Sequence, residues 1–509
     1  MPERATWQHG ARAASRAQQG GRCYASLRRC GKSAEAVVAA GMERRAEREG
    51  VPYAMSMRVA LRQMPATAGR VPIASGEAAR VRTSDEATRP RHETGRTGSA
   101  LLLAALTREN LQQAWKRVKA NKGAAGVDGR DIPETARYLQ SAWPGIRERL
   151  LQGTYRPSPV RRVTIPKPDG DERELGIPTV TDRLIQQALL QVLQPILDPT
   201  FSEHSFGFRP GRSAQEAVVR AQAHVQSGRR IVVDVDLEKF FDRVNHDILM
   251  GRLQRRIGEV GVLRLIRAYL NSGIMQDGIV VSRHQGTPQG GPLSPLLANV
   301  LLDEVDKELE RRGHCFVRYA DDANVYVRSR KAGERVMALL RTMYAKLHLM
   351  VNETKSAVAS AFGRKFLGFS FWMAPKGVIK CGVAVRPMAT YKQRIRQLTR
   401  RACGRSMVEV VERLRPYVLG WKAYFRLSQT PNVWRTLDEW MRHRLRAIQL
   451  KHWKRGLTMY RELKALGASE TVALRVAGNA RSWWRNAYRL INSVLTIAYF
   501  DRLGVPRLS

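Results

Sequence analysis

A pair of adjacent aspartates between two short apolar runs constrains this chain more than any other feature of its sequence. The runs Cys315–Val317 and Val325–Val327 flank Tyr319-Ala320-Asp321-Asp322, a pattern that predicts a β-hairpin with two carboxylates at its turn. Aspartate is also a common turn residue, so the pair alone is compatible with an ordinary turn. Two like charges this close repel each other unless a cation lies between them, which favours a divalent-metal site.

A third carboxylate upstream strengthens the metal-site interpretation. Ile231–Leu237 predicts a buried strand interrupted by Asp234 and Asp236, which strand alternation places on one face. Aspartate is rare in strands and costly to bury without a partner, and a metal ion offsets that cost. Asp236 brought together with Asp321 and Asp322 would form a two-metal site for phosphoryl transfer, and ligands that are all oxygen favour Mg²⁺.

The charge of the chain indicates a polyanionic partner. Of its 509 residues, 87 are Lys or Arg and 45 are Asp or Glu, which gives a formal charge of +42. This charge favours nucleic acid as the partner, ahead of a membrane surface or a merely basic exterior. The sequence contains no apolar run of 18 residues, so no membrane-spanning helix is expected. The five cysteines form no C-x-x-C pair, which argues against a zinc ribbon or a disulfide scaffold and fits a reducing cytosol.

Residues 1–100 differ from the rest of the chain. They are rich in Arg, Ala, Gly, Ser and Thr and show little periodicity, which predicts a disordered, low-complexity basic extension. The extreme N-terminus is nearly free of acids and weakly resembles a transit peptide, but Glu43, Glu47 and Glu49 argue against organelle import. A flexible arm or an upstream extension of the reading frame is the preferred interpretation.

From Leu101 the sequence alternates helical and strand-like segments, and beyond residue 380 it becomes helical and strongly basic. The alternation, which includes an amphipathic helix over Val300–Leu309, predicts an α+β layer architecture. In the basic part, the simplest interpretation makes the tryptophans core residues and the charges solvated helix faces. The density of both together favours a region that binds nucleic acid by neutralising phosphates and offering stacking surfaces.

Two loops carry further candidate residues. Gln285–Pro295 is rich in Gly and Pro, and its glycines allow the backbone to approach a nucleotide or a template base closely. Ile165–Gly170 predicts a turn that carries Lys167 and is followed by Arg173. Two cations across a turn could clamp a triphosphate, although the spacing alone also fits a surface hairpin.

Taken in order, these segments resemble a reverse transcriptase, and specifically the group II intron reverse transcriptase/maturase family. Each motif alone is weak, but the whole series in this order is highly specific. The matching segments extend from Asn121 to the C-terminal region: Asn121–Gly129, Ile165–Gly170, Ser205–Ser213, Asp236–Asp242, Gln285–Pro295, Tyr319–Asp322, Asn352 with Lys355, Phe366–Phe369 and, for the maturase part, Leu419–Phe425.

The resemblance implies a right-hand polymerase fold followed by helices. Fingers and palm, with an antiparallel sheet and the Tyr319–Asp322 hairpin, would occupy residues 101–378. An α-helical thumb or maturase (X) domain would follow at 379–470, and a basic helical segment at 471–509. No cysteine follows Cys403, so the Cys-rich nuclease domain of many family members is not expected, and priming would depend on an existing DNA end.

The resemblance also implies roles for individual residues of a polymerase site. Asp236 and Asp321 would be the principal ligands of two Mg²⁺ ions, with Asp322 beside them and the backbone carbonyl of Leu237 as a further ligand. The residues expected around the dNTP are Lys167 and Arg173 for the triphosphate, Gln289 near the nascent base pair, Phe241 against the sugar 2′ position and Lys355 as general acid for the leaving pyrophosphate.

Other residues are assigned to RNA or to the fold. Arg209 lies in a segment that contacts the template in the family, and the candidate RNA contacts in the helical part are Lys392, Arg396, Arg400 and Trp421. Four polar residues near the site are interpreted as structural: Asp234 as an acid that is not a ligand, Asp242 as the cap of the following helix, and His246 and His348.

The function that the resemblance implies is the copying of RNA into DNA, by a chain that also binds its group II intron RNA and promotes splicing and mobility. Its partners would be the intron RNA, an RNA template and a DNA primer or target, in a bacterial cytoplasm at the nucleoid, as a monomer or a homodimer. Three alternatives stay open. They are an RNA-binding splicing cofactor with little polymerase activity, which the intact Asp236, Asp321 and Asp322 argue against, a related defence or retroelement reverse transcriptase, and an RNA-dependent RNA polymerase, which Phe241 argues against.

Overall fold

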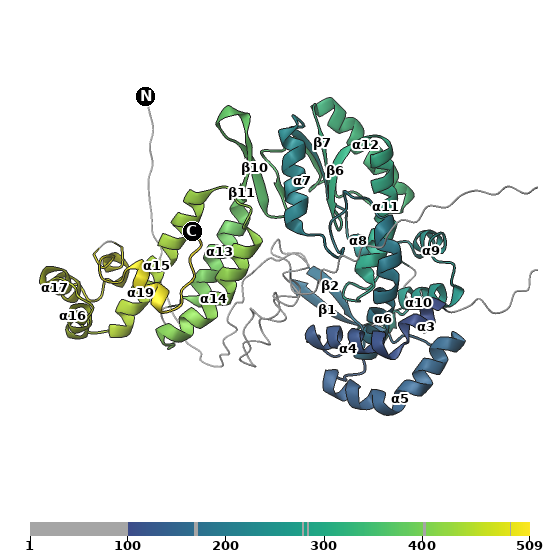
Figure 1. Cartoon of the computed structure of the whole chain (residues 1–509), viewed down its shortest axis with the longest axis horizontal. Helices are drawn as coiled ribbons and strands as arrows, with labels where there is room; N and C mark the ends of the chain where they lie inside the picture. Colours follow the sequence, from purple (N-terminus) through teal and green to yellow (C-terminus); the bar gives the residue numbers. More distant parts are fainter. Residues whose placement is uncertain (1–99, 167–171, 277–278, 282–284, 401–403, 489) are drawn as a thin grey trace, which may run out of the picture.

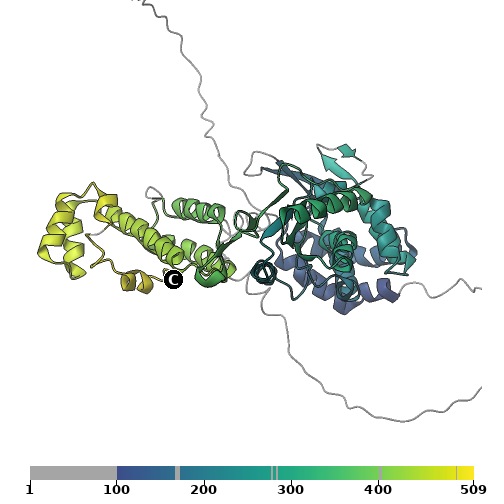
Figure 2. The ribbon, with the colours of Figure 1, turned by 90° about the horizontal axis from the view of Figure 1, so that it is seen from above.

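The computed structural model describes residues 100–166, 172–276, 279–281, 285–400, 404–488 and 490–509. The predicted N-terminal extension therefore lies outside the described residues. The described chain is elongated, with a mixed α/β part that carries a helical part at one end (Figure 1, Figure 2). This arrangement agrees with the predicted α+β fold followed by helices.

The Tyr319–Asp322 hairpin belongs to a four-stranded antiparallel sheet of order β6-β7-β3-β8. Its strands are β6 (Cys315–Tyr319), β7 (Asp322–Val327), β3 (Ile231–Val235) and β8 (Ala357–Ser360). Tyr319 pairs with Asp322, which leaves Ala320 and Asp321 as a two-residue turn. The predicted hairpin and its neighbouring strand are confirmed.

One face of this sheet buries a core shared with two helices. Val233 of β3 and Val325 of β7 pack into a cluster that includes residues of α11 (Ser294–Arg311) and α12 (Arg330–Lys346). In Figure 1, α11 and α12 lie beside β6 and β7. This core fixes the side of the sheet that faces away from the aspartates.

The opposite face carries the acids. Val232 and Tyr326 pack into a second cluster together with α7 (Ala214–Gln226). Alternate residues of a strand share a face, so Asp234 and Asp236 lie on the same side of β3 as Val232. The apolar part of this face therefore ends where the carboxylates begin.

A second sheet and a layer of helices form the rest of the mixed part. The sheet has the order β2-β1-β4-β5, with β1 (Val160–Pro166), β2 (Glu172–Ile177), β4 (Ile274–Gln276) and β5 (Ile279–Val281). The helices are α3 (Ala100–Ala105), α4 (Arg108–Ala120), α5 (Ile132–Gln152), α6 (Val180–Leu197), α8 (Phe240–Arg243), α9 (His246–Gln254) and α10 (Val260–Leu270), with a 3₁₀ turn at Asp198–Thr200.

The cap of α9 differs from the sequence prediction. Asp242 lies inside the short helix α8, whereas the side chain of Asn245 accepts hydrogen bonds from the amides of Asp247 and Ile248 at 3.0 Å each. Asn245 is therefore the N-cap and the assignment to Asp242 is wrong. A one-turn helix separates the two candidates, and a short helix of this kind is difficult to recognise from sequence.

The C-terminal part begins with a small antiparallel sheet of order β11-β10-β9 and continues as helices. The elements are β9 (Lys365–Phe366), β10 (Phe369–Met373), β11 (Ile379–Val383), α13 (Val385–Leu398), α14 (Met407–Tyr424), α15 (Pro431–Trp453), α16 (Gly456–Ala465), α17 (Glu470–Gly478), α18 (Trp483–Asn486) and α19 (Ile497–Arg502), with a 3₁₀ turn at Pro375–Gly377. The second apolar cluster continues from Tyr326 through Phe369 to Met441 and Phe500. One core thus joins the acid-bearing face of the β6-β7-β3-β8 sheet to the helices. No helix among the described residues is both long and apolar enough to cross a membrane.

The segment before α7 lies directly against the turn of the hairpin. A Cβ placed on Gly207 would lie 2.1 Å from the amide nitrogen of Ala320 and 2.8 Å from the carbonyl carbon of Tyr319. The amide of Phe206 donates to the carbonyl oxygen of Arg318 at 2.9 Å, at the edge of β6. Glycine at position 207 is therefore what allows the two backbones to touch.

We expect Gly207→Ala to lower the stability of this region by about 1–3 kcal/mol, because the added methyl group has no room beside Ala320. The measurement is the midpoint of thermal unfolding. Gly251→Ala is the control, since Gly251 lies inside α9 and a Cβ added there would meet nothing within 4 Å. The control should leave the midpoint unchanged or raise it. An unchanged midpoint for Gly207→Ala would contradict the close contact.

Candidate active site and nucleic-acid interface

The turn of the hairpin presents Asp321 and Asp322 from an unusual backbone. Ala320 has a φ of 59°, in the left-handed region that residues with a Cβ seldom adopt, and it is only 6% exposed. Asp236 directly follows Val235, the last residue of β3, which pairs with Ala323 of β7. The structure therefore brings Asp236 and the two turn aspartates to the same end of one sheet.

The electrostatics of this end of the sheet are dominated by acids. Burial raises the pKa of Asp322 well above the usual value of a carboxyl, and the charges of Asp234, Asp321 and Asp236 raise it further. The positive charge of Lys365 lowers that pKa again, by less. A divalent cation among these carboxylates would relieve their mutual repulsion.

The donor set fits Mg²⁺, although the acids do not form a closed cage. Among the residues that the structure describes, no three acidic, His or Cys side chains are grouped closely enough to hold an ion by themselves. Mg²⁺ needs no such cage, because it keeps several waters and is usually bound by one or two carboxylates together with substrate phosphates. Asp236 and Asp321 could supply these carboxylates, and Leu237, whose backbone bridges to Val351, adds a carbonyl next to Asp236. These assignments stay predictions.

Asp234 is engaged by a neighbouring arginine. Nε of Arg364 donates to its carboxylate at 2.7 Å, and the side-chain amide of Asn324, in the orientation that satisfies its contacts, donates to Asp234 Oδ1 at 3.0 Å. Burial raises the pKa of Asp234, and Arg364 opposes that rise. These partners agree with the interpretation of Asp234 as an acid that is not a metal ligand.

The segment that carries Lys355 is docked on the backbone of Asp236. The amide of Asn352 donates to the Asp236 carbonyl oxygen at 2.8 Å, and the amide of Asp236 donates to the Ser356 hydroxyl at 3.0 Å. Nη2 of Arg364 donates to the Lys355 carbonyl oxygen at 2.7 Å. The side chain of Lys355 is exposed, so its ammonium group stays accessible while its backbone is anchored beside a predicted metal ligand.

The Gln285–Pro295 loop connects two other predicted site residues. The amide of Thr287 donates to the Phe241 carbonyl oxygen at 2.7 Å, and the amide of Gly176 on β2 donates to the Gln289 carbonyl oxygen at 3.0 Å. The loop therefore lies between the β1–β2 hairpin and the segment of Phe241. This is the placement expected of a loop that borders the incoming nucleotide.

His246 fixes the start of that loop. Its Nε2 lies 2.7 Å from the carbonyl oxygen of Gly286, its Nδ1 lies 3.2 Å from Asn271 Oδ1, and its side chain is buried at 2% exposure. A Cβ on Gly286 would lie 2.8 Å from the carbonyl oxygen of Asp242, so the loop is held tightly against α8. The structural interpretation of His246 is confirmed.

The predicted triphosphate clamp is described only in part. The β1–β2 pairing places the backbone of Arg173 opposite Ile165. Lys167 and the side chain of Arg173 lie outside the described residues. Both roles stay predictions.

Arg209 does not have the surroundings of an RNA contact. Its guanidinium group donates to the carboxylate of Asp198 at 2.9 and 3.2 Å and to its carbonyl oxygen at 2.8 Å, and also to the carbonyl oxygens of Ser202 and Ser205 at 2.6 and 3.1 Å. The residue is 8% exposed. Every N–H group of Arg209 thus has a partner inside the protein, and we reassign it from template contact to shaping the Ser202–Arg209 segment.

Trp421 is likewise a packing residue. Its ring centroid lies 4.5 Å from that of Tyr391, 4.8 Å from that of Phe425 and 5.3 Å from that of Trp434. These rings join α13, α14 and α15 within the second core. Trp421 therefore helps to hold the three helices together. It is half-buried, and its predicted contact with RNA stays a prediction.

Lys392 and Arg396 gather around a different tryptophan. The cations of Lys392, Arg396 and Arg444 lie 6.0, 5.4 and 5.5 Å from the ring centroid of Trp440. We call these four residues the Trp440 cluster. Arg396 is exposed and Trp440 is half-buried, and Arg400 is exposed just beyond α13. This surface offers phosphate-binding cations around an aromatic ring, as expected of a nucleic-acid interface.

The sequence interpretation did not single out three cations that shape the site: Arg318, Arg364 and Lys365. A signal was present for Arg318, because it interrupts the apolar run before Tyr319. A charged residue in a strand that is otherwise apolar is expensive to bury, so it requires a specific partner.

Comparisons with known proteins agree with this geometry. A family model described as "Reverse transcriptase (RNA-dependent DNA polymerase)" matches residues 165–371, and one described as "Group II intron, maturase-specific domain" matches residues 388–467. The first extends from the end of β1 into β10 and includes all the predicted metal ligands. The second begins in α13 and ends after α16.

Individual relatives match part of the chain. "Protein YkfC" of Escherichia coli (strain K12) is 37% identical over 218 residues, which are 42% of this chain and 57% of that protein. "Group II intron-encoded protein LtrA" of Lactococcus lactis subsp. cremoris is 38% identical over 198 residues, which are 38% of this chain and 32% of that protein. The alignments thus span less than two thirds of either relative. A solved structure titled "Partial Cas6-RT-Cas1--Cas2 complex" is 26% identical, with a TM-score of 0.33, and covers 48% of this chain and 43% of that one.

The fold and the matches define the class of this protein: a reverse transcriptase domain is followed by a maturase-specific domain on one chain. The order of motifs and the relatives specify it further. The chain belongs to the group II intron reverse transcriptase/maturase family.

We expect Arg209→Lys and Arg396→Ala to have opposite effects. Lys cannot reproduce the five donor contacts of Arg209, so Arg209→Lys should lower the thermal midpoint and leave the RNA affinity of the folded protein unchanged. Arg396→Ala should leave the midpoint unchanged, weaken RNA binding and lower the slope of log affinity against log salt by about 0.7–0.9. Thermal unfolding measures the midpoints, and filter binding over a salt series measures the affinities. Weaker RNA binding by a fully folded Arg209→Lys would contradict the reassignment.

Proposed function

We propose that this protein is an RNA-directed DNA polymerase that extends a DNA primer on an RNA template and also binds its intron RNA to promote splicing. The observation that carries the proposal is the convergence of Asp236, Asp321 and Asp322 at one end of the palm sheet. The reverse transcriptase match over residues 165–371 supports the same conclusion.

The chemistry rests on charges that the fold holds in place. Two Mg²⁺ ions, when bound, would supply activation of the primer 3′-hydroxyl and stabilisation of the leaving pyrophosphate. Asp236 and Asp321 would hold these ions, and Asp322 would add charge beside them. The anchored backbone of Lys355 would keep its ammonium group near Asp236, where it could donate a proton to the pyrophosphate oxygen that leaves.

Substrate selection is assigned to the elements around the acids. Phe241 is fixed through its carbonyl to the Gln285–Pro295 loop, and its ring would exclude a 2′-hydroxyl from the sugar site. Gln289, tied to β2 through Gly176, would border the nascent base pair. Lys167 and Arg173 would neutralise the triphosphate from the β1–β2 hairpin.

The helical part supports the assignment of intron RNA as a partner. It contains the maturase-specific match and the Trp440 cluster, in which Arg396 is exposed and Lys392 and Arg444 are half-buried. The formal charge of +42 provides long-range attraction for RNA. Relatives named as intron-encoded come from bacteria as well as from yeast, and we propose a bacterial cytoplasmic role, in which splicing and DNA synthesis together move the intron.

We expect Asp321→Ala to lower primer extension on an RNA template with dNTPs and Mg²⁺ by at least about 10³-fold, because it removes a carboxylate that holds a catalytic ion. Asp247→Ala is the matched control: its side chain is 84% exposed and pairs with Arg267, away from the sheet. The control should extend the primer at the wild-type rate. Undiminished synthesis by Asp321→Ala would refute the metal assignment.

Splicing should respond to a different surface. We expect Asp321→Ala to promote splicing of the intron RNA as well as the wild type does, since the carboxylate is not an RNA contact. The double variant Lys392→Ala, Arg396→Ala should lose splicing promotion at physiological salt, because it removes cations from the Trp440 cluster. An in vitro splicing assay measures both. Full splicing activity in the double variant would remove the cluster from the proposed RNA interface.

A further inference from the structure

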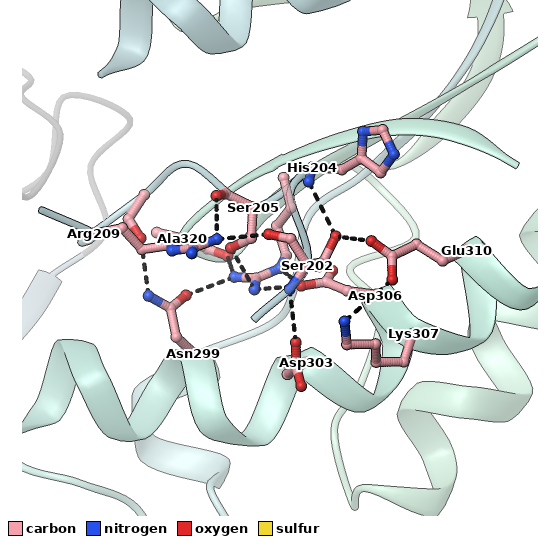
Figure 3. Close-up of polar contacts among 12 residues, drawn as sticks. Ser202, His204, Ser205, Arg209, Asn299, Asp303, Asp306, Lys307, Glu310 and Ala320 are labelled. Atoms are coloured by element: carbon pink, nitrogen blue, oxygen red, sulfur yellow. Dashed lines mark hydrogen bonds and ion pairs between the residues drawn. The ribbon is translucent and has the colours of Figure 1, made fainter. Parts of the chain in front are cut away.

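A stripe of polar side chains on α11 is buried against the palm rather than exposed to solvent. Asn299, Asp303 and Asp306 are each 1% exposed, and their spacing places them on one face of the helix. Figure 3 shows these side chains directed toward the Ser202–Ser205 segment and Ala320. Charges buried in this way are costly unless they are paired, so the stripe requires a cation inside the protein.

Arg318, the residue before Tyr319, is that cation. It is 1% exposed, and its Nε and Nη2 donate to the carboxylate of Asp306 at 2.5–2.9 Å. Nη2 also donates to the Ser205 hydroxyl at 2.7 Å. Nη1 donates to the carbonyl oxygen of Ala320 at 2.8 Å and to Asn299 Oδ1 at 2.9 Å. All five N–H groups of this guanidinium thus have partners.

Asn299 closes the network on the other side of the hairpin turn. Its Nδ2 donates to the carbonyl oxygen of Gly207 at 2.9 Å, and Gly207 is the residue whose backbone meets the amide of Ala320. The left-handed Ala320 therefore accepts a hydrogen bond from Arg318 at its carbonyl oxygen and packs at its amide against the backbone of Gly207. Both contacts lead through Asn299 to the same helix, α11.

We propose that Arg318 is a positioning residue for polymerisation, which fixes the turn so that Asp321 and Asp322 face Asp236. The inference rests on the proposed polymerase function for its activity readout, but the geometry of the turn can be measured independently. Arg318 touches neither substrate nor metal in this role. It acts by holding the Ala320 carbonyl and the Ser205–Gly207 segment in one fixed relation to Asp306.

The shape of arginine explains why no other residue would serve. Lysine would keep the positive charge opposite Asp306, but its single ammonium group carries three donors and cannot form the fork that reaches Asp306, Ser205, Asn299 and Ala320 together. The charge of Asp306 would then still be balanced, but the hydrogen bond to the Ala320 carbonyl oxygen would be lost. A displacement of about 1 Å at reacting groups can reduce a rate by about 10²-fold.

The test compares Arg318→Lys with Arg256→Lys. Arg256 makes the same kind of ion pair with the same helix, at 2.6 Å to Asp303, and has no described hydrogen bond to the hairpin. We expect Arg318→Lys to lower kcat for dNTP incorporation by about 10²-fold, with KM for dNTP changed less than about threefold and with unchanged RNA affinity. The Mg²⁺ concentration for half-maximal rate should rise. Arg256→Lys should show wild-type values for all four quantities.

A second measurement reports the turn without activity. Hydrogen–deuterium exchange followed by mass spectrometry should show faster exchange in peptides that contain residues 318–323 of Arg318→Lys, and not in those of Arg256→Lys. If the wild type proves inactive, the polymerase function fails while this measurement still decides the positioning role. Unchanged exchange in the turn, or a kcat that falls only in proportion to the folded fraction, would overturn the proposal.

The double variant Arg318→Met, Asp306→Leu covers the case in which Arg318→Lys does not fold. Replacing a buried ion pair by apolar residues of similar volume often preserves stability. This variant should keep the thermal midpoint and still show the loss of kcat and the faster exchange of the turn. A folded double variant with wild-type kcat would show that Arg318 has only a stabilising role.

Discussion

The ion pair of Arg318 and Asp306 is the interaction on which the active-site end of the palm depends. Both side chains are 1% exposed, and a charge buried at that depth is stable only with its partner in place. The hydrogen bonds that Arg318 and Asn299 donate connect α11, β6 and the Ser202–Gly207 segment at one place. The turn of the hairpin lies at that point, so the contact that makes the buried charges tolerable also fixes the backbone from which Asp321 and Asp322 extend.

The fold also holds several negatively charged side chains close together in spite of their mutual repulsion. Two like charges about 4 Å apart repel by about 4 kcal/mol at an effective dielectric constant of about 20, and Asp234, Asp236, Asp321 and Asp322 influence one another at the end of the sheet. Apolar packing on both faces and hydrogen bonds from Ser356 and Asn352 to the Asp236 backbone oppose that repulsion. A site held in this way would have little to rearrange on binding the proposed metal ions.

The sequence predicted the parts of the fold that follow from the alternation of apolar and polar residues in strands and from the positions of the aspartates. The hairpin at Ala320 and Asp321 and the strand before Asp236 both have local signatures. The buried polar stripe of α11 has none, because Asp303 and Asp306 look the same in the sequence whether they face water or Arg318. Arg209 was assigned to RNA for the same reason: its residue type suits RNA, and only the tertiary structure shows that partners inside the protein already engage it. The clamp of Lys167 and Arg173 stays a prediction.

The most direct test of the central claim is to locate Mn²⁺, in place of Mg²⁺, in a crystal of the protein with an RNA template, a DNA primer that lacks its 3′-hydroxyl and the next dNTP. Anomalous scattering would identify the ions. The account predicts two peaks roughly 3.5–4 Å apart, both contacting the triphosphate or the primer end and both ligated by Asp236 or Asp321. Ions at other side chains, or a bound dNTP with no ion at Asp236 and Asp321, would contradict it.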